Sequence, residues 1–379
     1  MTAAAPLAGT RVIDLGTRVA APYCAAILAE LGADVIKIED PRGGDMLRGL
    51  GPFADRSSLF FAVEGRSRRS VTCNLRDERG QALARRLIST ADVVCENFRP
   101  GTLERWNLGP ADLPPHLVVV RVSILGQNGP DSARPGLDLT AIAMAGLLSI
   151  TGYPDGPPMK SAVTVADHLT AVFAAQSALA ALVARRRTGR GAVIDVPLHG
   201  SVLRCLESTL ASFDRLGIER ARAGDQGPHE PPSGVYATID GTFVAIAIDN
   251  DDNLRALQSA LAVDAGRNHL RPLVAEWVAS LTAPSAVRLL ADAQVPAAIV
   301  ASAAHLVADD HLASRGDIVI VDDPIVGPVR QQAPFPRLAS TSVAVRPAPA
   351  LGEHNEQVWC DELGLTNAEL ERHRADGVI

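Results

Sequence analysis

Residue types that mark metal sites and Schiff-base enzymes are scarce in the 379-residue sequence. Its five cysteines are scattered, form no metal-ligand spacing and leave one unpaired, so we expect reduced thiols and no bound metal. Of the 36 basic residues only Lys37 and Lys160 are lysines, which leaves few candidates for a Schiff-base lysine. We therefore expect other residue types to carry the chemistry.

Excess positive charge and long apolar runs are also missing. The net charge of −7 and the pI of about 5.7 argue against nucleic acid or an anionic membrane as the main partner. The N-terminal residues lack the basic and apolar regions of a signal peptide, and no run of about 18 apolar residues occurs. We expect a cytoplasmic protein with neither nucleic-acid nor membrane partners, in which local arginines bind any anionic ligand.

The first half of the chain alternates apolar strands with helices, which is the pattern of an α/β protein with a mostly parallel sheet and helices on both faces. Helices are predicted at 22–31, 77–89 and 201–216. The predicted strands lie at 12–15, 35–39, 92–96, 117–123 and 192–196.

A change in composition at 224–233, which is rich in glycine, proline and charge, indicates a linker. Beyond it, two apolar strands flank Asp240-Gly241 and form the clearest predicted hairpin. A length of 379 residues suggests two or three domains. The predicted domains are a small α+β domain at 224–324 and a large domain at 1–223 plus 325–379.

The loop after the first predicted strand argues against a nicotinamide cofactor. Glu39 ends the second strand, where a dinucleotide-binding fold places its ribose-binding acid. The loop 16–21, however, holds one glycine where the fingerprint needs three. We therefore do not expect NAD binding.

Two other segments are candidate ligand contacts. Arg68 and Arg69 form a basic cluster that is either a solvated rim or a phosphate cradle, and the local sequence leaves both interpretations open. The turn that begins at Asn97 follows the strand 92–96. The carboxyl ends of parallel strands are where open α/β sheets bind ligands, so this turn is a second candidate.

Asp167 stands at the start of the longest predicted helix, just after the proline-rich loop 152–160. Thr164-Val165-Ala166-Asp167 matches a capping box, in which the carboxylate would only satisfy backbone donors. Alternatively, the same donors hold Asp167 ionised in a cleft as a nucleophile. The local sequence does not decide between the two.

An ordered set of short motifs spans nearly the whole chain. They are GADVIKIE at 32–39, GD at 44–45, RRS at 68–70, ADVVCENFRPG at 91–101, DGPP at 155–158, AD at 166–167, GRG at 189–191 and LGEH at 351–354. Together they resemble the family III CoA-transferases. The resemblance implies a Rossmann-like large domain built from both ends of the chain, an inserted small domain, and a homodimer of interlocked subunits.

The same resemblance implies an acyl-CoA:carboxylate CoA-transferase that uses Asp167 as its catalytic carboxylate. Asp167 would attack an acyl-CoA thioester to give a mixed anhydride, and the CoA thiolate would then form an aspartyl-CoA thioester. By the same resemblance, CoA and acyl-CoA would be substrates, and no metal or tightly bound cofactor would be needed. The CoA-binding positions that carry over from the family are Arg18, Ala20, Arg76, Asn97, Phe98 and Arg105.

Two alternatives remain open. The acyl-CoA racemases share the fold but have a histidine where this sequence has Leu137, and His168 is a poor substitute because adjacent helical residues point about 100° apart. The other alternative is a CoA-binding protein without catalysis, since Val19 replaces a glutamine of formyl-CoA transferase and the glycine-rich loop of that enzyme has no counterpart. His354 is expected to be structural. The sequence does not identify the donor or the acceptor acid.

Overall fold

The computed structural model describes residues 4–225, 232–339, 341 and 343–379. The chain forms two compact units. Unit 1 comprises the described residues up to Gly146, then Ser161–Glu207 and Ser314–Ile379. Unit 2 comprises Leu147–Lys160 and the described residues of Ser208–Ala313.

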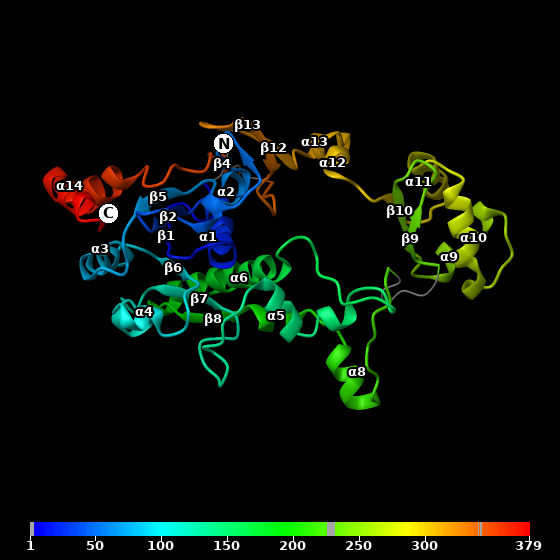
Figure 1. Ribbon diagram of the computed structural model, residues 1–379, viewed down its shortest axis with the longest axis horizontal. Coiled ribbons are helices and arrows are strands. Elements are labelled where there is room, and N and C mark those ends of the chain that lie inside the picture. The colour runs from blue at the N-terminus through cyan, green and yellow to red at the C-terminus, as the bar shows by residue number, and fades with distance from the viewer. Residues whose placement is uncertain (1–3, 226–231, 340, 342) are drawn as a thin grey trace. The chain divides into compact units, whose positions relative to one another are not determined.

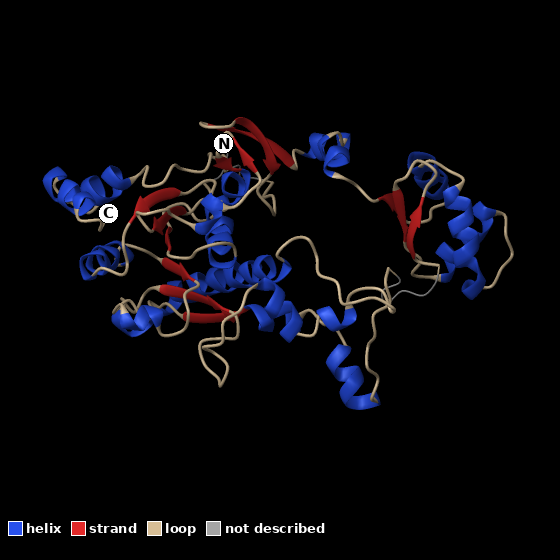
Figure 2. Ribbon diagram, viewed as in Figure 1, coloured by secondary structure: helices blue, strands red, loops and turns tan. Residues whose placement is uncertain are grey.

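A six-stranded sheet forms the centre of unit 1 (Figure 2). Its strand order is β5-β2-β1-β6-β7-β8, and every pair of neighbours is parallel, which confirms the predicted parallel sheet. The order reverses between β1 and β6, so the loops after these two strands diverge and leave room for a ligand. The strands are β1 (Arg11–Asp14), β2 (Asp34–Glu39), β5 (Arg69–Thr72), β6 (Val93–Glu96), β7 (Val118–Ser123) and β8 (Val193–Pro197).

Helices cover both faces of this sheet. The helices of unit 1 are α1 (Ala20–Glu30), η1 (Met46–Gly49), α2 (Leu59–Glu64), α3 (Glu78–Ile88), α4 (Thr102–Arg105), η2 (Pro110–Asp112), α5 (Asp138–Met144), α6 (Val165–Thr188), α7 (Leu198–Arg204), η4 (Glu356–Glu362) and α14 (Asn367–Ala375). One face carries α1 and α6, which contact each other (Figure 1). The other face packs against α3, α4, η4 and α14.

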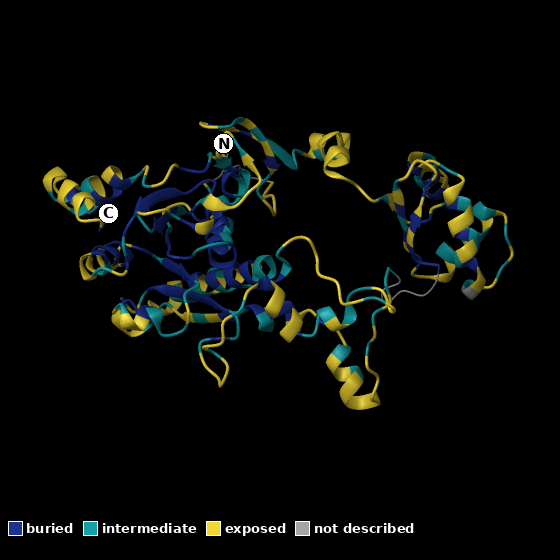
Figure 3. Cartoon of the chain, in the orientation of Figure 1, coloured by how far each residue is buried: buried dark blue, intermediate teal, exposed yellow. Residues whose placement is uncertain are grey.

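Side chains that alternate along each strand build the core. Ile13, Leu15, Ile36 and Ile38 join one buried cluster with Trp359 of η4. The six strands of the sheet are correspondingly dark in Figure 3, apart from the more exposed β8. Burial of each aliphatic side chain contributes about 1.5–3 kcal/mol, so this cluster fixes the strands that carry the loops of the site.

Small residues let α1 and α6 approach closely. The buried side chains of α6 recur every three or four positions and are mostly alanines, among them Ala171, Ala174 and Ala178. The buried face of α1 is also rich in alanine. By length and apolar composition α6 could cross a membrane, but its buried stripe packs within unit 1. The packing brings the first turns of α1 and α6 together.

The C-terminal segment is bound to β5. The side chain of Asn355 accepts from the backbone N–H of Thr72 (2.8 Å) and donates to the hydroxyl of the same residue (2.7 Å). Nδ1 of His354 accepts from the backbone N–H of Ser70 (3.2 Å), and the backbone N–H of His354 donates to the Ser70 carbonyl (2.9 Å). His354 is therefore structural, as expected.

Unit 2 contains a three-stranded antiparallel sheet with the order β11-β10-β9. The predicted Asp240-Gly241 hairpin is confirmed, with Val244 opposite Tyr236. Helices α9, α10 and α11 pack on this sheet. The elements are η3 (Leu148–Ile150), α8 (Thr209–Leu216), β9 (Gly234–Ala237), β10 (Phe243–Ile246), α9 (Asp251–Leu261), α10 (Arg267–Ala279), α11 (Ala283–Asp292), β11 (Ala297–Ile299), α12 (Ala303–Val307) and α13 (Asp310–Arg315), which crosses the boundary between the units.

The unit boundaries differ from the domain boundaries expected from sequence. Residues 314–324 belong to unit 1 because β12 (Ile318–Asp323) pairs along its length with β13 (Gly327–Gln332). The loop 147–160 belongs to unit 2 because its Gly152 carbonyl accepts from the N–H of Gly224 (2.9 Å). Residues 226–231 of the expected linker lie outside the described residues.

The helix predicted at 201–216 is in fact two helices, α7 and α8. Glu207 between them has a φ of 53°, which a continuous right-handed helix does not allow. The two helices belong to different units. A short two-stranded hairpin of unit 1, β3 (Phe53–Ala54) with β4 (Ser57–Ser58), was not predicted.

Candidate active site

The first turn of α6 is capped by a residue from a distant part of the chain. Oδ1 of Asp138, at the start of α5, accepts hydrogen bonds from the backbone N–H groups of Ala166 (2.8 Å) and Asp167 (3.2 Å). Thr164 makes no side-chain cap hydrogen bond. The capping-box interpretation of Asp167 is therefore wrong, because Asp138 accepts the N–H of Asp167 in place of Thr164, and the Asp167 carboxylate accepts no hydrogen bond from the N–H of Thr164. Among the described residues, none donates a hydrogen bond to the Asp167 carboxylate.

Asp167 is half-buried, and its surroundings favour the protonated carboxyl more than water does. Burial and the neighbouring negative charge of Asp138 raise the pKa of Asp167 to about 6, although His168 and Arg18 oppose the rise. A carboxyl of this pKa is still mostly ionised at neutral pH, and it is more basic than an exposed aspartate. These are suitable properties for a carboxylate nucleophile.

His168 contacts α1 and α2 more directly than it contacts Asp167. Its ring packs edge-on against Tyr23 of α1, with 4.8 Å between centroids. Nδ1 lies 2.8 Å from the Thr164 carbonyl, and Nε2 lies 3.8 Å from Glu64 Oε1. The Glu64 carboxylate raises the pKa of His168 above its ordinary value. These contacts make His168 a packing residue, in agreement with the expectation that it is a poor substitute for the racemase histidine.

The loop between β1 and α1 brings Arg18 towards Asp167. Arg18 has a φ of 64°, and its Nε donates to Sδ of Met46 (3.3 Å). Among the described residues Arg18 has no carboxylate partner within ion-pair distance, so its charge is available to a ligand. Gly16 must be glycine for packing, since a Cβ there would lie 2.8 Å from Cβ of Ala21.

Side chains from outside this loop hold its backbone. The amide of Asn97 accepts from the N–H of Thr17 (2.9 Å) and donates to its carbonyl (2.8 Å). Oδ1 of Asp45 accepts from the N–H of Arg18 (3.0 Å). Nζ of Lys37 donates to the Gly16 carbonyl (2.7 Å). The loop shape is therefore fixed before any ligand binds.

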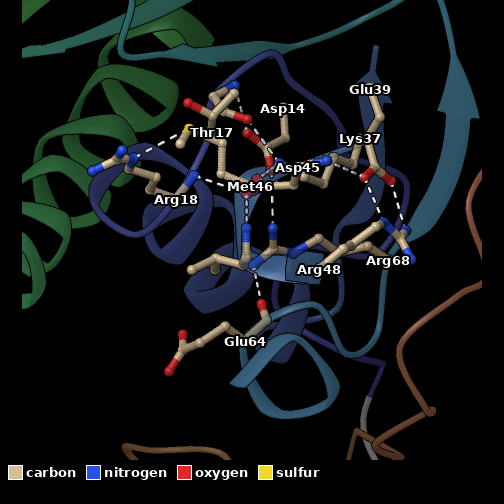
Figure 4. A network of polar contacts seen from close by, with 12 residues as sticks. Asp14, Thr17, Arg18, Lys37, Glu39, Asp45, Met46, Arg48, Glu64 and Arg68 are labelled. Atoms are coloured by element: carbon tan, nitrogen blue, oxygen red, sulfur yellow. Dashed lines mark hydrogen bonds and ion pairs between the residues drawn. The ribbon is translucent and has the colours of Figure 1, made fainter. Parts of the chain in front are cut away.

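Lys37 is also the centre of a buried ionic network (Figure 4). Its Nζ lies 2.8 Å from Asp45 and 3.2 Å from Asp14. Burial disfavours its charge, but the Asp14 and Asp45 carboxylates raise the pKa of Lys37 above its ordinary value. Beside it, Glu39 binds Arg48 through two hydrogen bonds of 2.8 Å, so this acid is not available to a ribose.

Neither interpretation of the Arg68 and Arg69 cluster is correct. Arg68 is 4% exposed and pairs with Asp14 at 2.9 Å. Arg69 is 7% exposed, donates from Nε to Asp34 (2.9 Å) and also pairs with Glu362. Both arginines are internal ion-pair partners and are neither a solvated rim nor a phosphate cradle. Their carboxylates come from other strands and from the C-terminal segment, which local sequence does not reveal.

A pocket of ≈ 100 Å³ lies at the carboxyl ends of β1, β2, β5 and β6. Gly16, Asp40, Arg76 and Phe98 are among the residues that line it. Two of the predicted CoA positions, Arg76 and Phe98, are therefore together at one site. The ring of Phe98 packs edge-on against Trp106, with 5.0 Å between centroids, which gives the pocket an aromatic wall.

The other predicted CoA positions lie around this pocket without lining it. Ala20 is buried as the first residue of α1 and offers only a methyl group and its backbone. Arg105 is exposed on α4 and donates to the Thr102 hydroxyl (2.9 Å). Asn97 has its amide bound to Thr17, so the structure gives it a loop-holding role that sequence reasoning did not predict.

Arg76 is exposed at the rim of the pocket. It pairs with Asp40 at 2.9 Å, and Arg42 pairs with the same oxygen at 2.8 Å. These two arginines hold the pKa of the Asp40 carboxyl well below its usual range. Two guanidinium groups converge here at the pocket rim, an arrangement that suits phosphate oxygens.

Sequence reasoning missed three residues that organise the site: Asp138, Lys37 and Asp45. A lysine inside the apolar strand Val35–Ile38 was a readable signal, because a buried lysine requires carboxylate partners. Nothing in the sequence around Asp138 indicates that it caps a helix 28 residues later.

Comparison with known proteins gives consistent matches. The model of "CoA-transferase family III" matches residues 7–355. The succinyl-CoA–D-citramalate CoA-transferase of Chloroflexus aurantiacus is 38% identical over 99% of this chain and 98% of its own length. The succinate–glutarate CoA-transferase of Agrobacterium fabrum is 32% identical, with 94% and 95% covered. A CAIB/BAIF family protein from Brucella suis has a solved structure with a TM-score of 0.84 and 30% identity, covering 94% of this chain and 99% of its own.

Proposed function

The chain belongs to the family III CoA-transferases, and we propose that it moves CoA between carboxylic acids through covalent intermediates on Asp167. The observation that carries the proposal is the free, half-buried Asp167 carboxylate, whose helix is capped by Asp138 instead. Resemblance to the family adds the chemistry that such a carboxylate performs.

In the proposed reaction an oxygen of Asp167 attacks the thioester carbonyl, the C–S bond breaks, and CoA leaves as its thiolate. The thiolate then attacks the aspartyl carbonyl of the mixed anhydride, releasing the donor acid as a carboxylate and leaving an aspartyl-CoA thioester. The acceptor carboxylate repeats the two steps in reverse order and regenerates Asp167. No net proton transfer occurs, and the thioester bond is conserved throughout.

We place CoA at the pocket beside the reversal of strand order. If the six strands of the sheet are numbered 1 to 6 along the chain, their order across the sheet is 3-2-1-4-5-6. This is the Rossmann order, and it supports a Rossmann-like large domain. Arg76 and Arg105 would bind phosphates, and Phe98 would contact the pantetheine arm. Arg18 and the backbone at Ala20 would contact the thioester end.

The relatives indicate the substrate class. Their names pair succinyl-CoA or succinate with citramalate, malate, glutarate or mesaconate, which are all dicarboxylic acids. We therefore propose succinyl-CoA as the donor and a small dicarboxylic acid as the acceptor. CoA and its thioesters would be substrates, with no tightly bound cofactor, and the reaction would take place in the cytoplasm.

We also propose that the enzyme is an interlocked homodimer, with the small domain inserted in the large one. On α8 the side chains of Leu210, Phe213 and Leu216 are 61%, 60% and 70% exposed, which is an apolar surface suited to a second copy of the chain. Most of helix α8 has the colour of exposed residues in Figure 3. A monomer mass in sedimentation equilibrium would contradict this proposal.

The test of function uses succinyl-CoA and a panel of acids, with new CoA thioesters identified by mass spectrometry. Asp167→Ala should lower transfer by about 1,000-fold or more, because it removes the atom that carries the intermediate. Asp195→Ala, which removes an exposed carboxylate of β8, serves as the matched control. Near-normal transfer by Asp167→Ala would refute the nucleophile. Proton exchange at Cα without transfer would indicate a racemase, and binding without turnover an inactive protein.

A further inference from the structure

Asp138 makes a contact that the proposed reaction does not yet explain. It is 9% exposed, and a single oxygen, Oδ1, accepts both N–H groups at the start of α6. The N–H of Val165 donates to the Val163 carbonyl (3.0 Å), and the N–H of His168 makes the first regular helix bond, to the Thr164 carbonyl (3.2 Å). The N–H groups of Val165, Ala166, Asp167 and His168 therefore all have partners.

We propose that Asp138 is a positioning residue for Asp167: it caps α6 and so leaves the Asp167 carboxylate free to react. An aspartate in the first turn of a helix ordinarily turns its side chain back to bind free N–H groups. Here Asp138 already takes the N–H groups of Ala166 and Asp167, so the Asp167 side chain cannot bind these two donors. The inference rests on the proposed nucleophilic role of Asp167.

The cap has an electrostatic consequence, because it is a second carboxylate. Three charged or titratable groups lie around Asp167: Asp138 of α5, His168 of α6 and Arg18 of the loop before α1. His168 is itself paired with Glu64 of α2. Of the first three, only Asp138 disfavours ionisation of Asp167. The cap therefore makes the nucleophile more basic as well as free.

Asparagine at position 138 separates these two effects. Its amide oxygen can accept the same two N–H groups, but it carries no charge. Asp138→Asn should therefore retain the shape of the turn while the Asp167 carboxyl becomes more acidic. Asp138→Ala removes both the acceptor and the charge.

The experiment measures the rate at which succinyl-CoA forms a covalent CoA adduct on the enzyme between pH 4.5 and 8, read by intact-protein mass spectrometry. In the unaltered enzyme the rate should fall as pH decreases through about 6. In Asp138→Asn the midpoint should move lower by about half a pH unit or more. Asp195→Asn is the matched control, since Asp195 also accepts a backbone N–H, from Gln127 at 2.8 Å, without acting on Asp167. His168→Gln shows which part of the profile belongs to the histidine.

An unmoved midpoint in Asp138→Asn, or an equal movement in Asp195→Asn, would overturn the inference. Asp138→Ala should form the adduct at least about tenfold more slowly, since two N–H groups lose their acceptor and Asp167 becomes free to bind them. An undiminished rate in that variant would also overturn the inference. If Asp167→Ala retains transfer, the proposed function fails; if it is inactive and the Asp138→Asn midpoint is unmoved, only the role of Asp138 fails.

Discussion

Replacement of Asp167 by asparagine should make the protein more stable above pH 6 while abolishing transfer. The site holds the carboxyl at a pKa of about 6, compared with an ordinary value of 3.8, through burial and the charge of Asp138. That difference corresponds to a destabilisation of up to about 3 kcal/mol when the group is ionised in the folded protein, before screening by solvent. An uncharged side chain of the same shape removes this penalty.

The sign and the pH range follow from the raised pKa. Because the folded protein binds the proton more tightly than the unfolded chain, the penalty is absent below about pH 4 and complete above about pH 6. The free energy of unfolding of Asp167→Asn should therefore exceed that of the unaltered protein by up to about 3 kcal/mol at pH 7.5. The two should converge as the pH approaches 4.

Urea unfolding followed by tryptophan fluorescence measures this difference. Two of the tryptophans, Trp106 and Trp359, lie in unit 1 with Asp167, and a Trp277→Phe background removes the signal of unit 2. Asp195→Asn, at an exposed carboxylate, should change stability by less than about 0.5 kcal/mol. The reasoning would be refuted if Asp167→Asn were no more stable at pH 7.5, or if its advantage were the same at every pH.

Two further predictions concern the residues that hold the loop between β1 and α1. Asn97→Ala leaves the backbone N–H and carbonyl of Thr17 without hydrogen-bond partners, and each loss costs about 1–3 kcal/mol of stability. The loop that carries Arg18 should therefore lose its shape. CoA should then bind at least about tenfold more weakly, as measured by calorimetry. Unchanged CoA affinity would contradict the proposed site. Lys37→Met should lower the free energy of unfolding by about 3–5 kcal/mol because it leaves the buried Asp45 carboxylate without an ion-pair partner among the described residues and Asp14 with Arg68 alone, whereas Lys160→Met, at an exposed position, should change it little. Similar effects of the two substitutions would show that the buried network does not stabilise the fold.

The sheet could be predicted from sequence because its signals are local. Strands such as Val93–Glu96 are short apolar runs between helices, and alternation of this kind implies parallel pairing. The hairpin around Asp240 was predictable for a similar reason, since its turn residues specify the connection. These features depend on neighbours within a few positions of the chain.

The contacts around the site could not be predicted because they join distant segments. The cap of α6 spans 28 positions, the bond from Asn97 to Thr17 spans 80, and Arg69 meets Glu362 across 293. A capping box at Thr164 was one of the two interpretations of Asp167 because only nearby partners are visible in a sequence. Likewise, Arg68 was expected at the surface or on phosphate because Asp14 is far from it in the chain.

The anchored backbone of the loop at Gly16–Arg18 has a consequence for how such enzymes can diversify. Since Asn97, Asp45 and Lys37 hold the peptide groups from neighbouring elements, the conformation of the loop owes little to the side chains of Thr17 and Arg18. Position 17 can then be exchanged with little penalty to the scaffold, and position 18, with its φ of 64°, can be exchanged for residues other than proline and the β-branched ones. A library randomised there, with the three anchors left intact, should yield mostly folded variants that differ in the acids they accept.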